Sequence, residues 1–215
     1  GRVEAAIDAA FETEPGRLTH RPKQVEVLSA DEVDKARGAF GRLRGDRQGG
    51  LQEFEAIVWS LMDAMSQTAR QMLALAPLRD HDEYLFVHAV NVSMLVLAQA
   101  RSFGIEGDDL HAMGLAAMLH DIGKLSVPRE LLRKPGKLDE TEWKAMKLHP
   151  ELGLWHLAQI QDSVPLALVV SFEHHLRFDG QPNYPMLSRP RRPCLASQFT
   201  ALADTYDAVC THRAY

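Results

Sequence analysis

Apolar residues recur at three- and four-residue spacing along the chain after residue 50, which is the pattern of amphipathic helices. Further helices are predicted over residues 82–103, 108–119 and 196–211. Residues 164–175 are nearly all apolar, so we expect that helix to be central in the fold. The clearest series predicts one long helix over residues 51–76, with an apolar face formed by Leu51, Phe54, Ile57, Val58, Leu61, Met62 and Met65.

Capping signals predict three additional helices. Residues 29–32, Ser-Ala-Asp-Glu, have the form of a capping box and open a short helix that ends at Leu43. Asp139 caps another helix, and Pro150 suits the first turn of the next one. The second half of the chain has no convincing alternating strand pattern. The expected fold class is therefore all-α.

Glycines at positions 45, 49 and 50 predict a linker that divides the chain into two parts. Residues 1–50 are polar and charged and carry no chemical motif, so we expect an N-terminal extension or a partial regulatory domain. Residues 51–215 are expected to form the catalytic bundle. The chain begins without Met and stops at Tyr215, so we expect missing flanking domains and an incomplete C-terminal end. For the helix over 51–76 we favour core packing over a homodimer contact.

The composition is that of a soluble globular protein of 215 residues, with 46% hydrophobic and 25% charged residues. A net charge of −5 argues against binding a nucleic-acid polymer, which requires a basic face. No apolar run reaches the roughly 18 to 20 residues of a membrane span. The two cysteines form no disulfide framework and no metal-ligand spacing, so a reducing cytoplasm is the expected location.

Ionisable residues interrupt the apolar helices at several points. Single histidines carry little information because the chain has ten of them, but His88 lies in the apolar run EYLFVHAVNV. His120 and Asp121 end a helix, His174 and His175 end another, and Asp204 interrupts FTALADTYDAV. Burying such groups costs several kcal/mol each unless they are paired or bind a metal. A metal cluster would satisfy all of them, whereas helix capping explains only one or two.

The spacing of these residues permits convergence. His120 and Asp121 differ in direction by roughly 100° on a helix, so at a helix end both can point into one cleft. Lys124 lies one turn beyond Asp121, where its ammonium group can contact a phosphate bound at the metals.

The motif HDIGK at residues 120–124, with His88 before it and Asp204 after it, resembles the HD superfamily of metal-dependent phosphohydrolases. The longer series adds KPGKLDETEWKAMKLHPELG, HHLRFDG and ADTYDAVCTHRAY. This series is similar to the HD-GYP subfamily, the bacterial cyclic-di-GMP phosphodiesterases. The resemblance covers residues 84–215 and implies an HD-domain helical bundle.

The resemblance also implies roles for individual residues. Asp121 would be a catalytic, bridging ligand, Lys124 would be catalytic and contact substrate phosphate, and Arg213 and Tyr184 would contact substrate. The ligand role of His149 rests on the resemblance, because the sequence alone is explained equally well by a histidine that merely ends a helix. The implied cofactor is a pair of divalent metal ions, with iron and manganese as the preferred candidates. The implied ligands are His88, His120, Asp121, His149, His174, His175 and Asp204.

The chain departs from the family pattern after His175. Leu176 stands where the family has Glu, and QPNYP at 181–185 replaces the small-Gly-Tyr-Pro stretch with one extra residue. Pro182 restricts the backbone, so we expect a reshaped loop that affects substrate choice and contacts with signalling partners. Members with three metals have a Glu four residues before the first ligand, where this chain has Tyr84, so we expect two metals.

Three functions remain open at this point. The favoured one is hydrolysis of cyclic-di-GMP to a linear dinucleotide or GMP, because a protein that only binds its ligand would be expected to lose metal ligands. The alternatives are a non-hydrolytic cyclic-dinucleotide sensor and a phosphohydrolase for a different nucleotide. Arg177 would add positive charge for the anionic ligand. Residues 189–192 hold a basic run that we interpret as solvated, and the histidines read as surface or packing residues are His20, His81, His111, His156 and His212.

Overall fold

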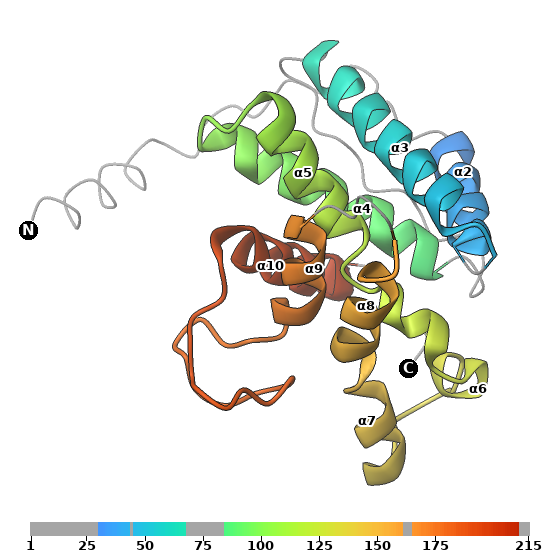
Figure 1. Cartoon of the computed structure of the whole chain (residues 1–215), viewed down its shortest axis with the longest axis vertical. Helices are drawn as coiled ribbons and strands as arrows, with labels where there is room; N and C mark the ends of the chain where they lie inside the picture. The colour runs from blue at the N-terminus through green and yellow to red at the C-terminus, as the bar shows by residue number, and fades with distance from the viewer. Residues whose placement is uncertain (1–29, 44, 68–83, 161–164, 211–215) are drawn as a thin grey trace, which may run out of the picture.

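The computed structural model describes residues 30–43, 45–67, 84–160 and 165–210, and these residues form helices and loops without strands. The all-α prediction is confirmed. The first helices are α2 (Ala30–Arg42), α3 (Arg47–Gln67), α4 (Tyr84–Ser102) and α5 (Gly107–Met118) (Figure 1). They are followed by the 3-10 helix η2 (Ile122–Ser126), α6 (Arg129–Leu132), α7 (Glu140–Met146), α8 (His149–Leu157), α9 (Pro165–Glu173) and α10 (Leu195–Cys210).

Helix α4 lies in the centre of the bundle. It contacts α2, α3, α5 and α10, and its buried residues include Val90, Val92 and Leu97. Its stretch Leu85–Ser102 is also long and apolar enough to span a membrane by composition, but 61% of that stretch is buried inside the protein. The helix expected to be central, now α9, packs against α5, α8 and α10 and leaves Val169 exposed.

Predicted helix starts are confirmed in the second half of the chain. The capping box of α7 is complete, because the Asp139 side chain accepts from the backbone N–H of Glu142 and the Glu142 side chain accepts from that of Asp139. Pro150 lies in the first turn of α8. Helices η2 and α6 were not predicted, since both are too short to show an apolar period.

The predicted linker at Gly49 and Gly50 is wrong, because α3 already begins at Arg47. The Asp46 carboxylate accepts from the N–H of Gly49 at 3.0 Å, which holds the start of the helix. A Cβ at Gly50 would lie 2.9 Å from the Leu43 side chain. These glycines therefore allow close approach of chain segments. The part of the predicted 51–76 helix beyond Gln67 lies outside the described residues.

Helix α2 packs into the same core as the rest of the bundle. The Phe40 ring lies 4.8 Å from Phe54 of α3 and 5.3 Å from Phe86 of α4, measured between ring centroids. Five of the seven residues of the apolar face predicted for α3 are buried in this core, and Met62 and Met65 are partly buried against it, which agrees with core packing for that helix. A domain boundary near residue 50 stays a prediction, as does the role of residues 1–50.

Two glycines bring backbones together where the ends of α5, α8 and α9 meet. A Cβ at Gly123 would lie 1.9 Å from the carbonyl oxygen of His149, and one at Gly153 would lie 2.2 Å from Ser171 Oγ. Ser171 also donates to the carbonyl oxygen of His120 at 3.1 Å. The residues that follow α5 are thereby held against the first residues of α8.

We expect Gly123→Ala to lower the free energy of unfolding by about 1–3 kcal/mol, because the new methyl group would overlap the His149 backbone. Gly38→Ala is the matched control. Gly38 lies on the exposed face of α2 with nothing within 4 Å of the new carbon, so alanine should stabilise by about 1 kcal/mol. Chemical denaturation measures both, and a neutral Gly123→Ala would contradict the close approach.

Candidate metal centre

The seven side chains predicted to be metal ligands lie together, although they come from five places in the chain. Asp121 is central, with one carboxylate oxygen 3.3 Å from His120 Nε2 and the other 3.3 Å from His149 Nε2. His88 Nε2 lies 3.2 Å from Asp204 Oδ1 and 3.7 Å from Asp121 Oδ2. His174 lies 3.8 Å from Asp121, and His175 Nε2 lies 3.2 Å from His149 Nε2. The convergence expected from sequence is therefore present.

Hydrogen bonds at Nδ1 set the orientation of four of these rings. His120 and His149 each bond through Nδ1 to the carbonyl oxygen three residues earlier, at 2.7 and 2.8 Å. His174 bonds through Nδ1 to the carbonyl oxygens of Val170 and Ser171, four and three residues earlier. His88 Nδ1 lies 2.7 Å from a carboxylate oxygen of Asp207. A neutral imidazole that donates through Nδ1 has a lone pair on Nε2, which is the metal-binding form.

These lone pairs face one another. His149 Nε2 lies 3.2 Å from His174 Nε2 and 3.2 Å from His175 Nε2. The Nε2 of His120 and the Oδ1 of Asp121 are buried and lie in no hydrogen bond. Several electron-rich atoms in contact repel one another unless a cation lies between them, so the donor set fits divalent metal ions.

The donor atoms fall into two groups, within each of which all ligand atoms lie within 4.8 Å of one another. One group is His88, His120 and Asp121, and the other is His149, His174 and His175. Asp121 contacts histidines of both groups through different oxygens, which is the geometry required of a bridging carboxylate.

Burial keeps most of the histidines neutral at physiological pH. Burial lowers the pKa of His149 to about 4 and that of His175 to about 3, and it lowers the pKa of His174 well below the usual value. Their Nε2 atoms therefore need not lose a proton to bind a metal near neutral pH.

His88 and Asp121 behave differently because opposite charges surround them. Burial favours neutral His88, but hydrogen bonds to Asp204 and Asp207 and the charge of Asp121 raise its pKa to about 9. Burial also disfavours the Asp121 carboxylate, yet the nearby Lys124 and His120 hold the pKa of Asp121 well below its usual range. Lys124 donates directly to Asp121 Oδ2 and remains partly exposed.

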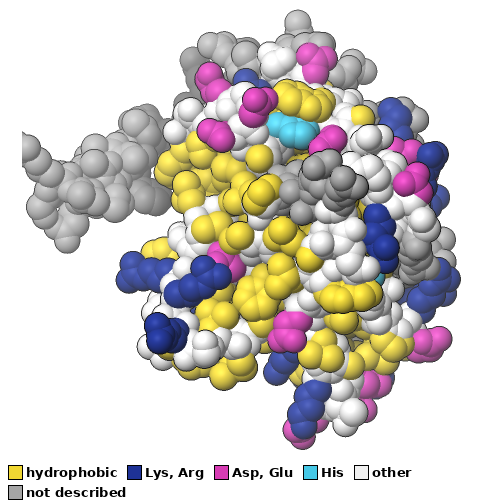
Figure 2. Space-filling view, viewed as in Figure 1, with side chains coloured by type: hydrophobic (Ala, Val, Ile, Leu, Met, Phe, Trp, Pro, Cys, Tyr) yellow, Lys and Arg dark blue, Asp and Glu magenta, His cyan; other side chains and the backbone are white. Residues whose placement is uncertain are grey.

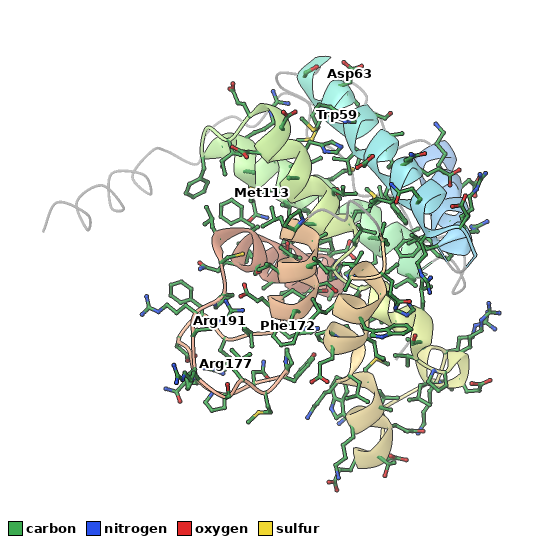
Figure 3. The ribbon with its side chains drawn as sticks, in the orientation of Figure 1. Trp59, Asp63, Met113, Phe172, Arg177 and Arg191 are labelled. Atoms are coloured by element: carbon green, nitrogen blue, oxygen red, sulfur yellow. The ribbon has the colours of Figure 1, made fainter. Side chains whose placement is uncertain are left out.

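Residues 181–185 place Tyr184 beside the cluster. Its ring lies 4.5 Å from the ring of His175 and 6.2 Å from that of His149. Asn183 donates to the carbonyl oxygen of His175 at 2.7 Å. Arg177 forms a two-bond ion pair with Asp179 at the exposed edge of this segment (Figure 3). Arg213 lies outside the described residues.

Comparison with known proteins identifies the architecture. The family model described as HD domain matches residues 85–209. This chain belongs to the HD domain family.

The curated relatives of this HD domain are phosphodiesterases by name. Cyclic di-GMP phosphodiesterase PA4108 of Pseudomonas aeruginosa is 31% identical over 99% of this chain and 53% of its own length. Cyclic di-GMP phosphodiesterase response regulator RpfG of Xanthomonas campestris is 34% identical over 54% of this chain and 31% of its own length. The 3′3′-cGAMP-specific phosphodiesterase 2 of Vibrio cholerae is 31% identical over 60% of this chain and 24% of its own length. The chain thus spans about half the length of the first of these relatives, and less of the other two.

Sequence reasoning missed two buried carboxylates of this HD domain. Asp207 lies one turn after Asp204 on α10 and contacts both His88 Nδ1 and Asn91 Nδ2, the latter at 2.8 Å. Its place in the apolar run ADTYDAV was the available signal.

Glu173 is the second missed carboxylate and is fully buried. Its Oε2 accepts from the backbone N–H of Cys194 at 2.8 Å and from Ser197 Oγ at 2.9 Å, at the start of α10. Its Oε1 lies 2.6 Å from the guanidinium of Arg191. Glu173 therefore ties the end of α9, which precedes His174 and His175, to the helix that carries Asp204.

We expect Asp207→Asn to weaken Mn²⁺ binding about 10- to 100-fold, because the amide has one oxygen for two donors and loses the charge that orients His88. Competition with a chelator measures the affinity. Thr205→Ala is the control on the same helix, since it removes only an exposed bond to Ala201. Equal affinities of the two variants would argue against orientation by Asp207.

We expect Glu173→Gln to lower the free energy of unfolding by about 1–3 kcal/mol. Its NH2 group would replace the carboxylate oxygen that faces the Arg191 guanidinium, so two donors would meet at a buried side chain. Glu140→Gln makes the same change in the exposed pair with Lys144 and should leave the denaturation midpoint nearly unchanged. Similar midpoint shifts in both variants would contradict the anchoring role.

Proposed function

We propose that this HD domain is a metal-dependent phosphodiesterase that hydrolyses a cyclic dinucleotide, with cyclic-di-GMP as the first candidate. The observation that carries the proposal is the set of histidine Nε2 atoms directed at both oxygens of Asp121, with Lys124 beside them. The names of the relatives support the substrate class, since they include cyclic di-GMP and 3′3′-cGAMP phosphodiesterases.

In this proposal the site holds two divalent ions, iron or manganese first. His88, His120 and Asp204 would hold one ion, His149, His174 and His175 would hold the other, and Asp121 would contribute to both. Tyr84 at the start of α4 supplies no carboxylate for a third ion. Such ions lower the pKa of a coordinated water and neutralise charge on a phosphoryl group.

The protein's own residues then bind and position the phosphodiester. The Lys124 ammonium, fixed by Asp121, is in reach of phosphate oxygens near the cluster and stabilises the negative charge that develops on them. Tyr184 lies against His175, and Arg213, outside the described residues, stays a predicted substrate contact. In the hydrolysis, the oxygen of a water molecule forms a bond to phosphorus and one P–O3′ bond breaks. A proton from that water ends on the 3′ oxygen of the linear product.

Two alternatives remain distinct from this proposal. A mixed cyclic dinucleotide as substrate is favoured by the Vibrio cholerae relatives named for 3′3′-cGAMP. A non-hydrolytic sensor is favoured by the altered residues 181–185 next to His175. Cytoplasmic location, homodimerisation and signalling partners at that loop also stay predictions.

The test is hydrolysis of cyclic-di-GMP and 3′3′-cGAMP by anaerobically purified protein, with metal content determined on the same sample. We expect a linear dinucleotide product and about two metals per chain. The double variant His120→Ala, Asp121→Ala should lose turnover by a factor of at least about 10³, because it removes the bridging ligand and one donor.

His156→Ala is the control, since His156 bonds to Ser126 outside the cluster. Bound metal with no turnover of either nucleotide would favour the sensor. Absence of bound metal would contradict the proposal as a whole.

A further inference from the structure

A cationic and aromatic surface lies beside the His149 side of the metal centre. It is formed by Trp143 of α7, Lys147 just after that helix, and Tyr184 of the loop of residues 181–185. The Lys147 ammonium lies 5.9 Å from the Trp143 ring centroid and 6.0 Å from the Tyr184 ring centroid. One cation thus lies between two aromatic rings that come from segments about forty residues apart, at distances typical of cation–π contacts.

Short contacts connect this surface to the metal centre. Tyr184 lies against His175 and faces His149, as described above. Lys147 precedes His149 by two residues, and His149 Nδ1 bonds to the carbonyl oxygen of Met146. Tyr184 therefore contacts both Lys147 and the proposed ligand His175.

The groups on this surface remain available to a ligand. The Trp143 side chain is 46% exposed, and Lys147 is exposed. Within the described residues, neighbouring basic groups pair with acids, as in Lys134 with Glu142 and Lys144 with Glu140, whereas no acidic group lies within ion-pair distance of Lys147.

Two basic residues of the described chain near the loop are paired with acids. Arg177 pairs with Asp179, and Arg191 pairs with the buried Glu173, whereas the Arg192 guanidinium lies 5.3 Å from the Phe178 ring centroid. Figure 2 shows lysine and arginine side chains gathered at this edge of the protein, below the hydrophobic face of α5, α9 and α10. Lys147 is a cation without a carboxylate partner among the described residues, and it lies beside Tyr184, which packs on His175.

A cyclic dinucleotide has two phosphodiesters and two bases, and only one phosphodiester can occupy the metal centre at a time. We propose that Trp143, Lys147 and Tyr184 form the subsite for the second half of the substrate. Lys147 binds the second phosphate, and the exposed indole of Trp143 stacks on a purine. This inference rests on the proposed function, since it assigns the half of the substrate that is not cut.

The test compares a substrate that has a second half with one that does not. Cyclic-di-GMP has both phosphates, while bis(p-nitrophenyl) phosphate is a phosphodiester with one phosphate and no purine. We expect Lys147→Met to lower the ratio of kcat/KM for cyclic-di-GMP to that for bis(p-nitrophenyl) phosphate about tenfold, mainly through KM. Lys147→Arg should restore most of that ratio, because it retains the charge.

Lys144→Met is the matched control, because Lys144 lies on α7, three residues before Lys147, and pairs with exposed Glu140. It should leave the ratio as in the natural chain. Trp143→Ala should lower the ratio about tenfold as well. Cyclic-di-GMP should also quench tryptophan fluorescence when it binds, and this quenching should be lost in Trp143→Phe.

The outcomes separate the subsite from the proposed function. Turnover by the natural chain with an unchanged ratio in Lys147→Met would overturn the subsite and leave the phosphodiesterase intact. Equal losses in Lys144→Met and Lys147→Met would also overturn it, since general surface charge would then explain the effect. Hydrolysis of neither substrate by the metal-loaded natural chain would overturn the proposed function and the subsite with it.

Discussion

A hydrogen bond at Nδ1 holds four of the clustered histidines, and the rest of the site depends on this constraint. The Nδ1 atoms of His120, His149 and His174 bond to backbone carbonyl oxygens, and that of His88 bonds to the Asp207 carboxylate. Each bond fixes the ring and leaves Nε2 directed at Asp121 or at another histidine. The cluster is therefore held in place by the protein, and burial keeps three of the histidines neutral by lowering their pKa.

This arrangement requires helix ends to meet at short distance. Gly123 allows η2 to lie against the first residue of α8, and Gly153 allows α8 to lie against Ser171 of α9. Glu173 then joins the end of α9 to the start of α10 through donors from Cys194 and Ser197. Packing and polar anchoring thus act on the same few residues that precede the proposed ligands.

The surface around the cluster is less symmetrical than the cluster itself. Lys124 lies directly on Asp121, whereas Tyr184 and Lys147 lie on the His149 side. The loop of residues 181–185 is attached to the site, because Asn183 bonds to the backbone of His175 and Tyr184 packs on its ring. These contacts make the loop a contributor to substrate choice in the proposed function, while the metal-binding atoms come from the helices and their ends.

The sequence by itself determined the all-α class, the helix starts at Asp139 and Pro150, and the candidate ligands, because apolar periodicity, caps and the HDIGK motif are local patterns. It misread Gly49 and Gly50 as a linker, whereas both lie in the first turn of α3, close to the Asp46 and Leu43 side chains. It also missed Asp207 and Glu173, since a carboxylate in a helix shows its partners only when distant segments are placed beside it. Tertiary structure alone decided which nitrogen of each histidine faces the centre, because that choice depends on hydrogen bonds and burial that arise only in the packed bundle.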